Sequence, residues 1–384
     1  MDVSFFSEFS TLEIATCLFA MTYVILMVFL TIGLLRLSAS KLIDISKLPT
    51  VSVIVSSRNE EKDLPGCIES LEKLDYPQEK LEIILVNDRS TDSTWDIIKE
   101  ACSRNEHFFG YDTAEYKNHN LEAKGRGISF GFKYAKHEWV FITDGDAYVH
   151  PKWLRACLGD IDESIGMVGG ALLVEPISLL AKLERACWAF VQMFNLGMSG
   201  WGVPFACVGP NMAIRRSIYE EAGGLEGSEF TVAEDLALLK MVTNAGYKIR
   251  TYMDEESAVK LKPVPSIGHL ISQQRRWLRG GIDTDLKYLG FLTLAFGWGL
   301  FISIYMLLGW IISLKLFLIF TFLRILIDII YLSIQRKRLK TKNYVRNFWL
   351  LTLYIPIICS ILPISFIFTR KIYWKGDDYE ITYE

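Results

Sequence analysis

The stretch HEWVFITDGDAYVHPKWLR, residues 137–155, decides the fold that this sequence predicts. Residues 140–143 form a short apolar, β-prone run that ends abruptly at Asp144-Gly145-Asp146. Open α/β sheets place ligands at the carboxyl ends of buried strands. Two carboxylates separated by a glycine, which lets the backbone turn, can face a hard divalent cation that bridges to substrate phosphates. The alternative is a solvated Asp-Gly turn that merely ends a strand, so the rest of the chain must decide.

Composition indicates membrane segments. Hydrophobic residues make up 51% of the 384 residues, and the mean hydropathy is +0.24. The net charge of −3 gives no sign of a nucleic-acid partner, and we expect none. The 7 cysteines are odd in number, scattered and without a CxxC pair. This pattern argues against a disulfide framework or a zinc site and fits a reducing compartment.

The first hydrophobic run predicts a membrane anchor. Residues 14–35 carry no charge and are long enough to cross the bilayer as a helix. No basic segment precedes the run and no convincing cleavage site follows it, so we interpret it as an anchor rather than a signal peptide. Arg36, Lys41 and Lys47 come next. The basic-residue rule then puts the N-terminus outside and the chain from Arg36 onward in the cytoplasm.

Strand and helix patterns alternate in the region that follows. Residues 51–56 form a short strand with Glu60 after it, and residues 82–86 form another with Asp88 after it. Helical patterns start near Asp63, around Trp95 and at about residues 122–135. Alternation at this spacing predicts βαβ units and a mostly parallel sheet.

Three strands therefore end in acids that gather at one edge of the sheet. Clustered carboxylates repel each other, so a metal or the donor groups of a ligand must stabilise them. The base and ribose of a nucleotide supply such donors, and its diphosphate needs a cation. The glycines of Gly125-x-Gly127-x-x-x-Gly131 have the wrong spacing for a dinucleotide fingerprint, and no strand precedes them.

Two further motifs follow a predicted helix (153–158), strand (165–174), helix (179–198) and glycine-proline turn (205–211). Glu234 and Asp235 open a helix that stops at Gly246. Their alternative role is to complement the helix dipole. The sequence QQRRW at 273–277 sits on a basic helix before the next hydrophobic run, and its alternative is an interfacial amphipathic helix.

In this order the residues resemble the family-two inverting glycosyltransferases, which have the A-type glycosyltransferase fold. The likeness runs from about Val51 to Trp277 and includes the flanking membrane segments. It rests on the NDRSTDST loop at 87–94, the DGD triplet, the Glu-Asp pair and Gln-x-x-Arg-Trp. Each motif is weak alone, but all four in this order are specific. Cellulose, hyaluronan and chitin synthases share the set, as do ceramide glucosyltransferase-like enzymes.

The resemblance implies a donor site at the acidic edge. Asp88, with Glu60 nearby, would accept hydrogen bonds from the uracil or ribose, and Lys124 would contact the nucleotide. Asp144 would contact the nucleotide sugar. Asp146, together with Asp144, would hold Mg²⁺ or Mn²⁺ on the diphosphate.

It also implies the catalytic and acceptor-side roles. Asp235, beside Glu234, would be the base that takes the proton of the acceptor hydroxyl. Gln273, Arg276 and Trp277 would cover the diphosphate and shape the acceptor mouth. Displacement at an anomeric carbon needs a stabilised leaving group and a carboxylate on the opposite face. A single displacement would invert the anomeric centre.

Two positions depart from the family pattern. Arg89 stands where a glycine is common, which affects the nucleotide loop. Ala233 precedes the Glu-Asp pair where synthases often carry threonine. Neither departure removes a catalytic group. A nucleotide-binding scaffold without catalysis would be favoured by a missing base or metal acid, and both are present. A nucleotidyltransferase gives no reason for the 273–277 motif beside the membrane.

The C-terminal part predicts a membrane bundle. Residues 288–314 are uncharged, and residues 316–334 contain Arg324 and Asp328, which we interpret as a structural pair rather than a polar patch on the acceptor path. Six basic residues in 336–346 predict a cytoplasmic loop.

The last hydrophobic segment, residues 347–369, contains Pro356 and Pro363. Strict alternation puts the tail outside, but its basic residues favour the cytoplasm. We therefore expect a re-entrant hairpin or a kinked helix. The tail resembles the Trp-Lys/Arg-Gly-Arg-x-Tyr ends of some membrane glycosyltransferases, with Asp377 in place of the arginine.

The sequence thus predicts an α/β, Rossmann-like A-type glycosyltransferase domain with a mostly parallel sheet, flanked by transmembrane helices. The expected division is an anchor at 1–36, a cytoplasmic catalytic domain at 48–265, an interfacial helix at 266–286 and a membrane bundle at 287–384. The expected reaction moves a sugar from a UDP-sugar to an acceptor hydroxyl, most simply that of a membrane lipid. The alternative acceptor is a glycan, as in a processive polysaccharide synthase.

Overall fold

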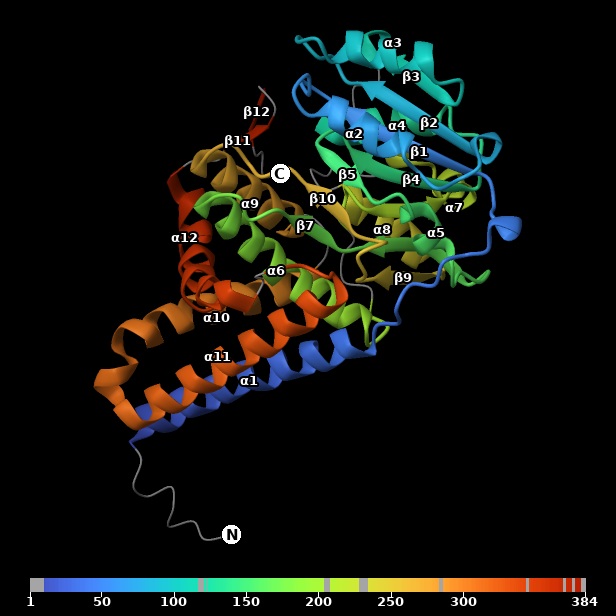
Figure 1. Ribbon diagram of the computed structural model, residues 1–384. Helices are drawn as coiled ribbons and strands as arrows, with labels where there is room; N and C mark the ends of the chain where they lie inside the picture. Colours follow the sequence, from blue (N-terminus) through green and yellow to red (C-terminus); the bar gives the residue numbers. More distant parts are fainter. Residues whose placement is uncertain are drawn as a thin grey trace.

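A seven-stranded sheet forms the centre of the α/β part of the molecule (Figure 1). The computed structural model describes residues 10–116, 121, 123–203, 208–227, 234–282, 286–342, 345–368, 371–374 and 377–380. In sheet order the strands are β3 (Phe108–Asp112), β2 (Leu81–Asn87), β1 (Val51–Ser57), β4 (Trp139–Asp144), β8 (Met212–Arg215), β6 (Ile165–Gly170) and β9 (Lys248–Tyr252). Strands β3, β2, β1 and β4 run parallel, β8 is antiparallel to both its neighbours, and β6 is parallel to β9. The predicted α/β fold with a mostly parallel sheet is confirmed.

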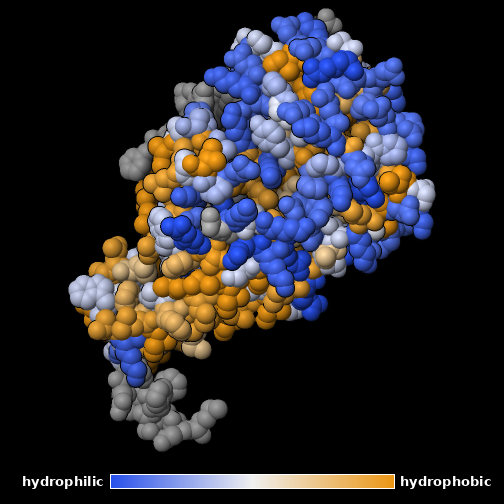
Figure 2. All heavy atoms as spheres, in the orientation of Figure 1, coloured by the Kyte–Doolittle hydropathy of each residue, from blue (hydrophilic) through white to orange (hydrophobic). Residues whose placement is uncertain are grey.

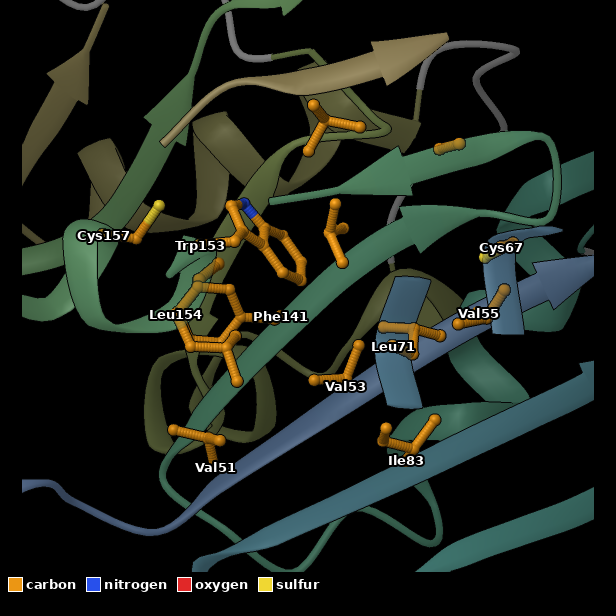
Figure 3. Packing of buried hydrophobic residues seen from close by; sticks show 14 of the residues in the cluster. Val51, Val53, Val55, Cys67, Leu71, Ile83, Phe141, Trp153, Leu154 and Cys157 are labelled. Atoms are coloured by element: carbon orange, nitrogen blue, oxygen red, sulfur yellow. The ribbon is translucent and has the colours of Figure 1, made fainter. Parts of the chain in front are cut away.

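Helices cover both faces of this sheet. The helices of the region are α2 (Leu64–Glu72), α3 (Thr94–Arg104), α4 (Ala123–Phe132), α5 (Trp153–Leu158), α7 (Arg216–Glu221) and α8 (Glu234–Asn244). Val53 and Phe141 pack on one face against Leu71 and Trp153, as Figure 3 shows. Alternate strand residues such as Ile54 pack on the other face with residues of α4, α7 and α8. Strands buried on both faces read as continuous apolar runs, which is why the sequence reveals them.

The predicted strand at 165–174 is wrong as a single element. It is two strands, β6 and β7 (Leu172–Val174), and β7 belongs to a three-stranded sheet with β10 (Val259–Leu261) and β5 (Ala147–Val149). The chain changes sheets at Ala171, whose carbonyl accepts from Val259 N–H at 3.1 Å and from Asn211 Nδ2 at 2.9 Å. A Cβ at Gly170 would lie 2.7 Å from the Ser257 carbonyl oxygen, so this crossing requires glycine.

Long helices form the second part of the molecule. They are α1 (Thr11–Arg36), α6 (Leu179–Ser199), α9 (Ile267–Ile282), α10 (Leu286–Ile312), α11 (Leu314–Arg338) and α12 (Ile355–Phe368). Figure 1 shows α1 and α11 side by side, with α6 between the helical part and the sheet. Hydrophobic atoms cover this end of the surface in Figure 2, whereas the sheet domain is mostly hydrophilic. In the described chain, 3 helices are long and apolar enough to cross a membrane: Thr11–Arg36, Leu314–Arg338 and Val345–Ser365.

The segment after α11 is helical throughout residues 350–368. A π-helical turn at Leu350–Tyr354 leads into α12, which contains Pro363 in its interior. The hairpin alternative is therefore wrong for these residues, and the irregular-helix alternative agrees with the structure. A proline inside a helix removes one backbone hydrogen bond and bends the helix. Arg370 and Lys375 lie outside the described residues, and the side of the membrane on which the tail lies stays a prediction.

The pair on α11 has structural contacts within the helical part. Arg324 Nε lies 3.7 Å from Asp328 Oδ2, and both side chains are buried. Thr352 Oγ1 donates to Asp328 Oδ2 at 2.6 Å, and Arg324 Nη2 donates to the Leu351 carbonyl at 3.2 Å. The pair therefore ties α11 to the π-helical turn, in agreement with the structural interpretation.

Helices α1 and α6 cross at glycines. A Cβ at Gly33 would overlap the Gly197 carbonyl oxygen and lie 2.8 Å from the Trp201 ring. Trp201 stacks on Phe29 with ring centroids 4.6 Å apart, and Arg36 Nε donates to the Gly200 carbonyl at 3.1 Å. Small residues let the two backbones approach closely, so α1 is packed directly on α6.

This crossing predicts a stability effect. Gly33→Ala adds one methyl group where no space exists, so the apparent Tm in detergent should fall by roughly 3–8 °C. The matched control is Gly268→Ala on α9, where a Cβ would meet only Ser266 Oγ at 3.7 Å. An equal Tm for Gly33→Ala and wild type would show that α1 does not pack on α6 in this way.

Candidate active site

The acids predicted from the sequence meet at the carboxyl edge of the sheet. Strand register pairs Ser56 of β1 with Asp144 of β4, and Ser57 of β1 with Asn87 of β2. Glu60 follows β1 and is buried, and its N–H donates to Thr94 Oγ1 at 2.8 Å. The cluster forms because parallel strands of matched length end at the same level.

The DGD turn lies directly against Glu60. A Cβ at Gly145 would lie 2.6 Å from Ser57 Oγ and 3.2 Å from Glu60 Cγ, so only glycine fits between the two aspartates. Cys67, one turn into α2, donates its Sγ–H to the Asp144 carbonyl at 3.4 Å. Burial raises the pKa of the Cys67 thiol, and the negative charges of Asp146, Asp144 and Glu60 raise it further. The Glu60 side chain therefore lies beside the DGD turn.

Asp88 lies at the same edge with basic partners. Its Oδ1 accepts from Thr113 Oγ1 at 2.8 Å and from Arg89 Nε at 3.3 Å, and Arg126 Nε lies 3.6 Å away. Arg89 has φ of 54°, the left-handed conformation that explains why a glycine is common at this position. The turn therefore keeps the shape typical of glycine at the cost of some backbone strain.

Lys124 connects two of the predicted acids. Its Nζ forms an ion pair with Asp144 Oδ1 and lies 3.2 Å from Glu234 Oε1. Burial opposes the charge on Lys124, but the two carboxylates outweigh this effect and raise its pKa. Lys124 reaches the edge because α4 packs closely on β1, where a Cβ at Gly127 would overlap Ser56 Oγ and one at Gly131 would lie 2.6 Å from Ile54. These glycines therefore serve packing, in agreement with the rejection of a dinucleotide fingerprint.

Asp235 is held at the start of α8. Leu236 N–H donates to its Oδ1 at 2.9 Å, and Gly209 N–H donates to its Oδ2 at 3.2 Å. Burial, followed by the charge of Glu234, raises the pKa of Asp235 to about 7, although Lys124 acts in the opposite direction. A Cβ at Gly209 would lie 2.7 Å from Lys124 Nζ. Residues 205–207 and Ala233, also named in the sequence analysis, lie outside the described residues.

The motif on α9 lies partly against the protein interior. Gln273 Nε2 donates to Glu184 Oε1 at 3.3 Å, and the Trp277 ring lies 4.2 Å from that of Trp188. Arg276 is partly buried and forms no ion pair with any residue in the described ranges. Of the three motif residues, the structure thus gives Gln273 and Trp277 protein partners on α6.

Sequence reasoning missed two residues near this edge. Glu184 is buried in α6, where a mostly apolar pattern hid it, and Arg126 lies two positions after Lys124. The only signal for Glu184 was an acid in a mostly apolar helix, because a carboxylate is costly to bury without partners. The sequence gives no such signal for Arg126, because arginines are common on exposed helix surfaces that have no functional role.

Comparison with protein families gives the same answer as the geometry. Residues 52–223 match "Glycosyl transferase family 2", and residues 139–362, more than half of the chain, match "Glycosyl transferase family group 2". The chain belongs to glycosyl transferase family group 2. It is a glycosyltransferase of the family 2 type, and the predicted enzyme class is confirmed.

Several family 2 relatives align with about two thirds of this chain. The probable glycosyltransferase YdaM of Bacillus subtilis is 30% identical over 64% of this chain and 58% of its own length. The beta-monoglucosyldiacylglycerol synthase of Nostoc is 24% identical over 63% of this chain and 51% of its own. A poly-beta-1,6-N-acetyl-D-glucosamine synthase of Staphylococcus epidermidis is 25% identical over 62% and 56%. The chain thus spans little more than half the length of these relatives.

A solved structure supports the fold of this family 2 glycosyltransferase. A mannosyltransferase from Pyrobaculum calidifontis, solved with GDP-mannose and Mn²⁺, superposes with a TM-score of 0.54. The match covers 92% of this chain and 96% of that one at 16% sequence identity. This likeness shows the A-type glycosyltransferase fold.

The raised pKa of Asp235 predicts a pH-dependent stability. A carboxyl whose pKa is about 7 in the folded protein and 3.8 ordinarily costs stability when ionised. That cost is absent near pH 4, grows as the pH rises and is complete above about pH 7. Asp235→Asn removes the cost, so the variant should exceed wild type in Tm by roughly 2–6 °C at pH 8 and match it near pH 4.

The control is Asp96→Asn on α3, since the Asp96 side chain is 76% exposed. Its Tm difference from wild type should be small and similar at both pH values. A lower Tm for Asp235→Asn than for wild type at pH 8 would show that the ionised carboxylate stabilises this site.

Proposed function

We propose that this family 2 enzyme is a membrane-anchored inverting glycosyltransferase that moves a sugar from a UDP-sugar to an acceptor hydroxyl. One observation carries the proposal: Lys124 lies between Asp144, which ends β4, and Glu234, which precedes Asp235. The Lys124 ammonium group thus contacts the acid suited to a cation-bound diphosphate on one side. On the other side it contacts Glu234, the neighbour of the carboxylate suited to accept a proton.

The carboxylate oxygens at this edge are suitable ligands for Mg²⁺ or Mn²⁺. Asp144 and Asp146 would hold the ion, and the Glu60 side chain, next to Gly145, would add negative charge there. Carboxylate oxygens suit these hard cations, which typically use one or two carboxylates and complete their shell with water and phosphate oxygens. Among the described residues no 3 His, Cys, Asp or Glu side chains are placed to hold an ion by themselves, so the donor phosphates and water would have to supply the other ligands. When bound, the cation would neutralise charge on the departing diphosphate.

Protein side chains would make the remaining contacts with the UDP-sugar. Asp88, Glu60 and Lys124 would bind the nucleotide, with Arg276 on the diphosphate and Gln273 and Trp277 shaping its surroundings. A guanidinium suits a diphosphate because its planar donors match phosphate oxygens. Lys124 would then exchange part of its contact with Asp144 for the phosphates.

Asp235 would act as the base, with Glu234 beside it. Its pKa of about 7 is close to the value at which a general base is most effective near neutral pH. The N–H groups of Gly209 and Leu236 fix the carboxylate orientation. Proton removal on the face opposite the leaving group gives inversion in one displacement.

A membrane lipid is the proposed acceptor. On α9, Ile267 and Ile271 are 58% and 39% exposed, and this helix would lie at the bilayer surface beside α10. A lipid headgroup could then reach the site without leaving the membrane. The lipid glycosyltransferase of Nostoc supports this acceptor, whereas the Staphylococcus polymer synthase supports the glycan alternative.

The proposed domain organisation is the one predicted from the sequence. Residues 1–36 would anchor the chain, 48–265 would form the cytoplasmic catalytic domain, 266–286 the interfacial helix and 287–384 the multi-pass membrane bundle. The three candidate spans are compatible with this arrangement. A nucleotide-binding scaffold without catalysis is disfavoured because the acids and the base gather at one edge.

Kinetics of two variants test the roles. Asp235→Asn should reduce kcat by about 10²–10⁴-fold, because it removes a positioned base but little volume, while leaving UDP affinity nearly unchanged. Asp146→Ala should instead weaken UDP binding in the presence of Mn²⁺, as measured by calorimetry with and without the ion. Near-normal turnover of Asp235→Asn, or equal UDP affinities for wild type with and without Mn²⁺, would refute the corresponding role.

Product size tests the acceptor. Purified enzyme is incubated with a panel of labelled UDP-sugars and a lipid extract, and the label is followed through organic extraction. The lipid proposal expects extractable product with one sugar added. Label that resists extraction and is released by a polysaccharide hydrolase would overturn it.

A further inference from the structure

Glu184 is a buried carboxylate inside a mostly apolar helix. Its side chain is 1% exposed, and it lies near the start of α6. Both of its oxygens accept hydrogen bonds from outside this helix: Oε2 from Val264 N–H at 2.8 Å, and Oε1 from Gln273 Nε2 at 3.3 Å. An unpaired carboxylate here would be costly to bury, so these two bonds decide how α6 meets the start of α9.

Val264 belongs to a short connection that begins beside Asp146. Residues 262–264, which we name the strap, lead from β10 towards α9. At the start of the strap, Lys262 N–H donates to the Asp146 carbonyl at 3.3 Å, and Lys262 Nζ pairs with Asp63. Pro263 restricts the backbone between the two bonded N–H groups. The strap therefore has one end on the DGD turn and the other on Glu184.

A second contact repeats the Glu184–Gln273 contact one helical turn further along. Trp188 is four residues after Glu184, and Trp277 is four residues after Gln273. Residues four apart lie on the same face of a helix, so the two pairs form successive rungs between α6 and α9. The tryptophan rings lie 4.2 Å apart, and Trp277 packs against two core clusters.

We propose that Glu184 and Trp188 are positioning residues that hold Gln273 and Trp277. These two contacts between α6 and α9 form a brace, and the strap couples the brace to Asp146. Arg276, between the two rungs in sequence, is thereby fixed relative to the acidic edge. The coupling to donor binding rests on the proposed function, in which Asp146 and Arg276 contact the donor.

This role explains why α6 and α9 meet through a polar contact between Glu184 and Gln273. A purely apolar contact would let α9 slide along α6, whereas a carboxylate that accepts two hydrogen bonds sets one register. Misplacing a group that contacts the transition state by about 1 Å can cost on the order of 10²-fold in rate. Loss of the rung should therefore appear in kcat more than in donor affinity.

Three variants test the brace. Glu184→Ala removes both acceptors, so kcat should fall about 10–100-fold while the donor dissociation constant changes less than about threefold. Glu184→Gln should keep kcat within about fivefold of wild type. The introduced carbonyl can accept from Val264, and its NH₂ can donate to Gln273 Oε1, a buried atom with no hydrogen bond among the described residues.

Glu82→Ala is the matched control. Glu82 is also buried and also accepts two hydrogen bonds, from Ser52 Oγ at 2.5 Å and Lys136 N–H at 2.6 Å. It lies at the start of β2, at the opposite edge of the sheet from the acids. Its loss should lower Tm about as much as Glu184→Ala, but without the fall in kcat at a temperature where both variants are folded.

Hydrogen exchange gives a readout that does not need turnover. Adding Mn²⁺ and UDP should slow amide exchange in peptides covering 262–278 of wild type and Glu82→Ala, but not of Glu184→Ala. Slowing in all three proteins, or equal kcat for Glu184→Ala and wild type, would overturn the brace. If wild type binds Mn²⁺ and UDP but transfers no sugar, the proposed transfer fails while the exchange comparison still decides the brace.

Discussion

The ion pairing of the partly buried Lys124 ammonium group is the interaction on which the rest of the site depends. Lys124 pairs with Asp144 and Glu234, in a region where Asp146, Asp235 and Glu60 add further negative charge. Without a cation at this point, like charges in a partly buried region would repel each other and push the strand ends and α8 apart. Lys124 reaches this point only because glycines on α4 allow that helix to pack closely on β1. A packing constraint on one face of the sheet therefore determines the electrostatics at its edge.

Helix α6 connects this edge to the long apolar helices. At its C-terminal end the glycines pack on α1, and near its N-terminal end Glu184 contacts both the strap and α9. One continuous helix therefore contacts both α1 and the motif on α9 that would cover the diphosphate (Figure 1). This arrangement fixes the acidic edge relative to α1 and α9.

The sequence predicted the elements whose local pattern is strong. Strands β1, β2 and β4 are buried on both faces and read as apolar runs, and the acids that follow them were found because parallel strands end together. Strand β3 was missed because only its first residue is buried at this sheet edge. The change of sheets at Ala171 was also missed, because it depends on Asn211 and Ser257, which are distant in sequence.

The site shows the same division. Residues on recognisable motifs, such as Asp144 and Asp235, were predicted, and the structure brings them to one edge. Glu184 was not predicted, because its importance depends on which residues α9 places opposite it. Gln273 and Trp277 were predicted as ligand contacts, but their protein partners on α6 became visible only from the packing of two helices. Local patterns identify the chemistry, and tertiary contacts determine its geometry.

The central claim is that this edge binds a cation together with a nucleoside diphosphate, and that Lys124 changes partners when they bind. The most direct measurement is anomalous diffraction from crystals of the protein grown with Mn²⁺ and UDP. The account predicts one manganese peak between the Asp146 side chain and the diphosphate, with Lys124 Nζ moved from Asp144 towards a phosphate oxygen. Bound UDP with no manganese at this edge, and with Lys124 still paired to Asp144, would contradict the claim.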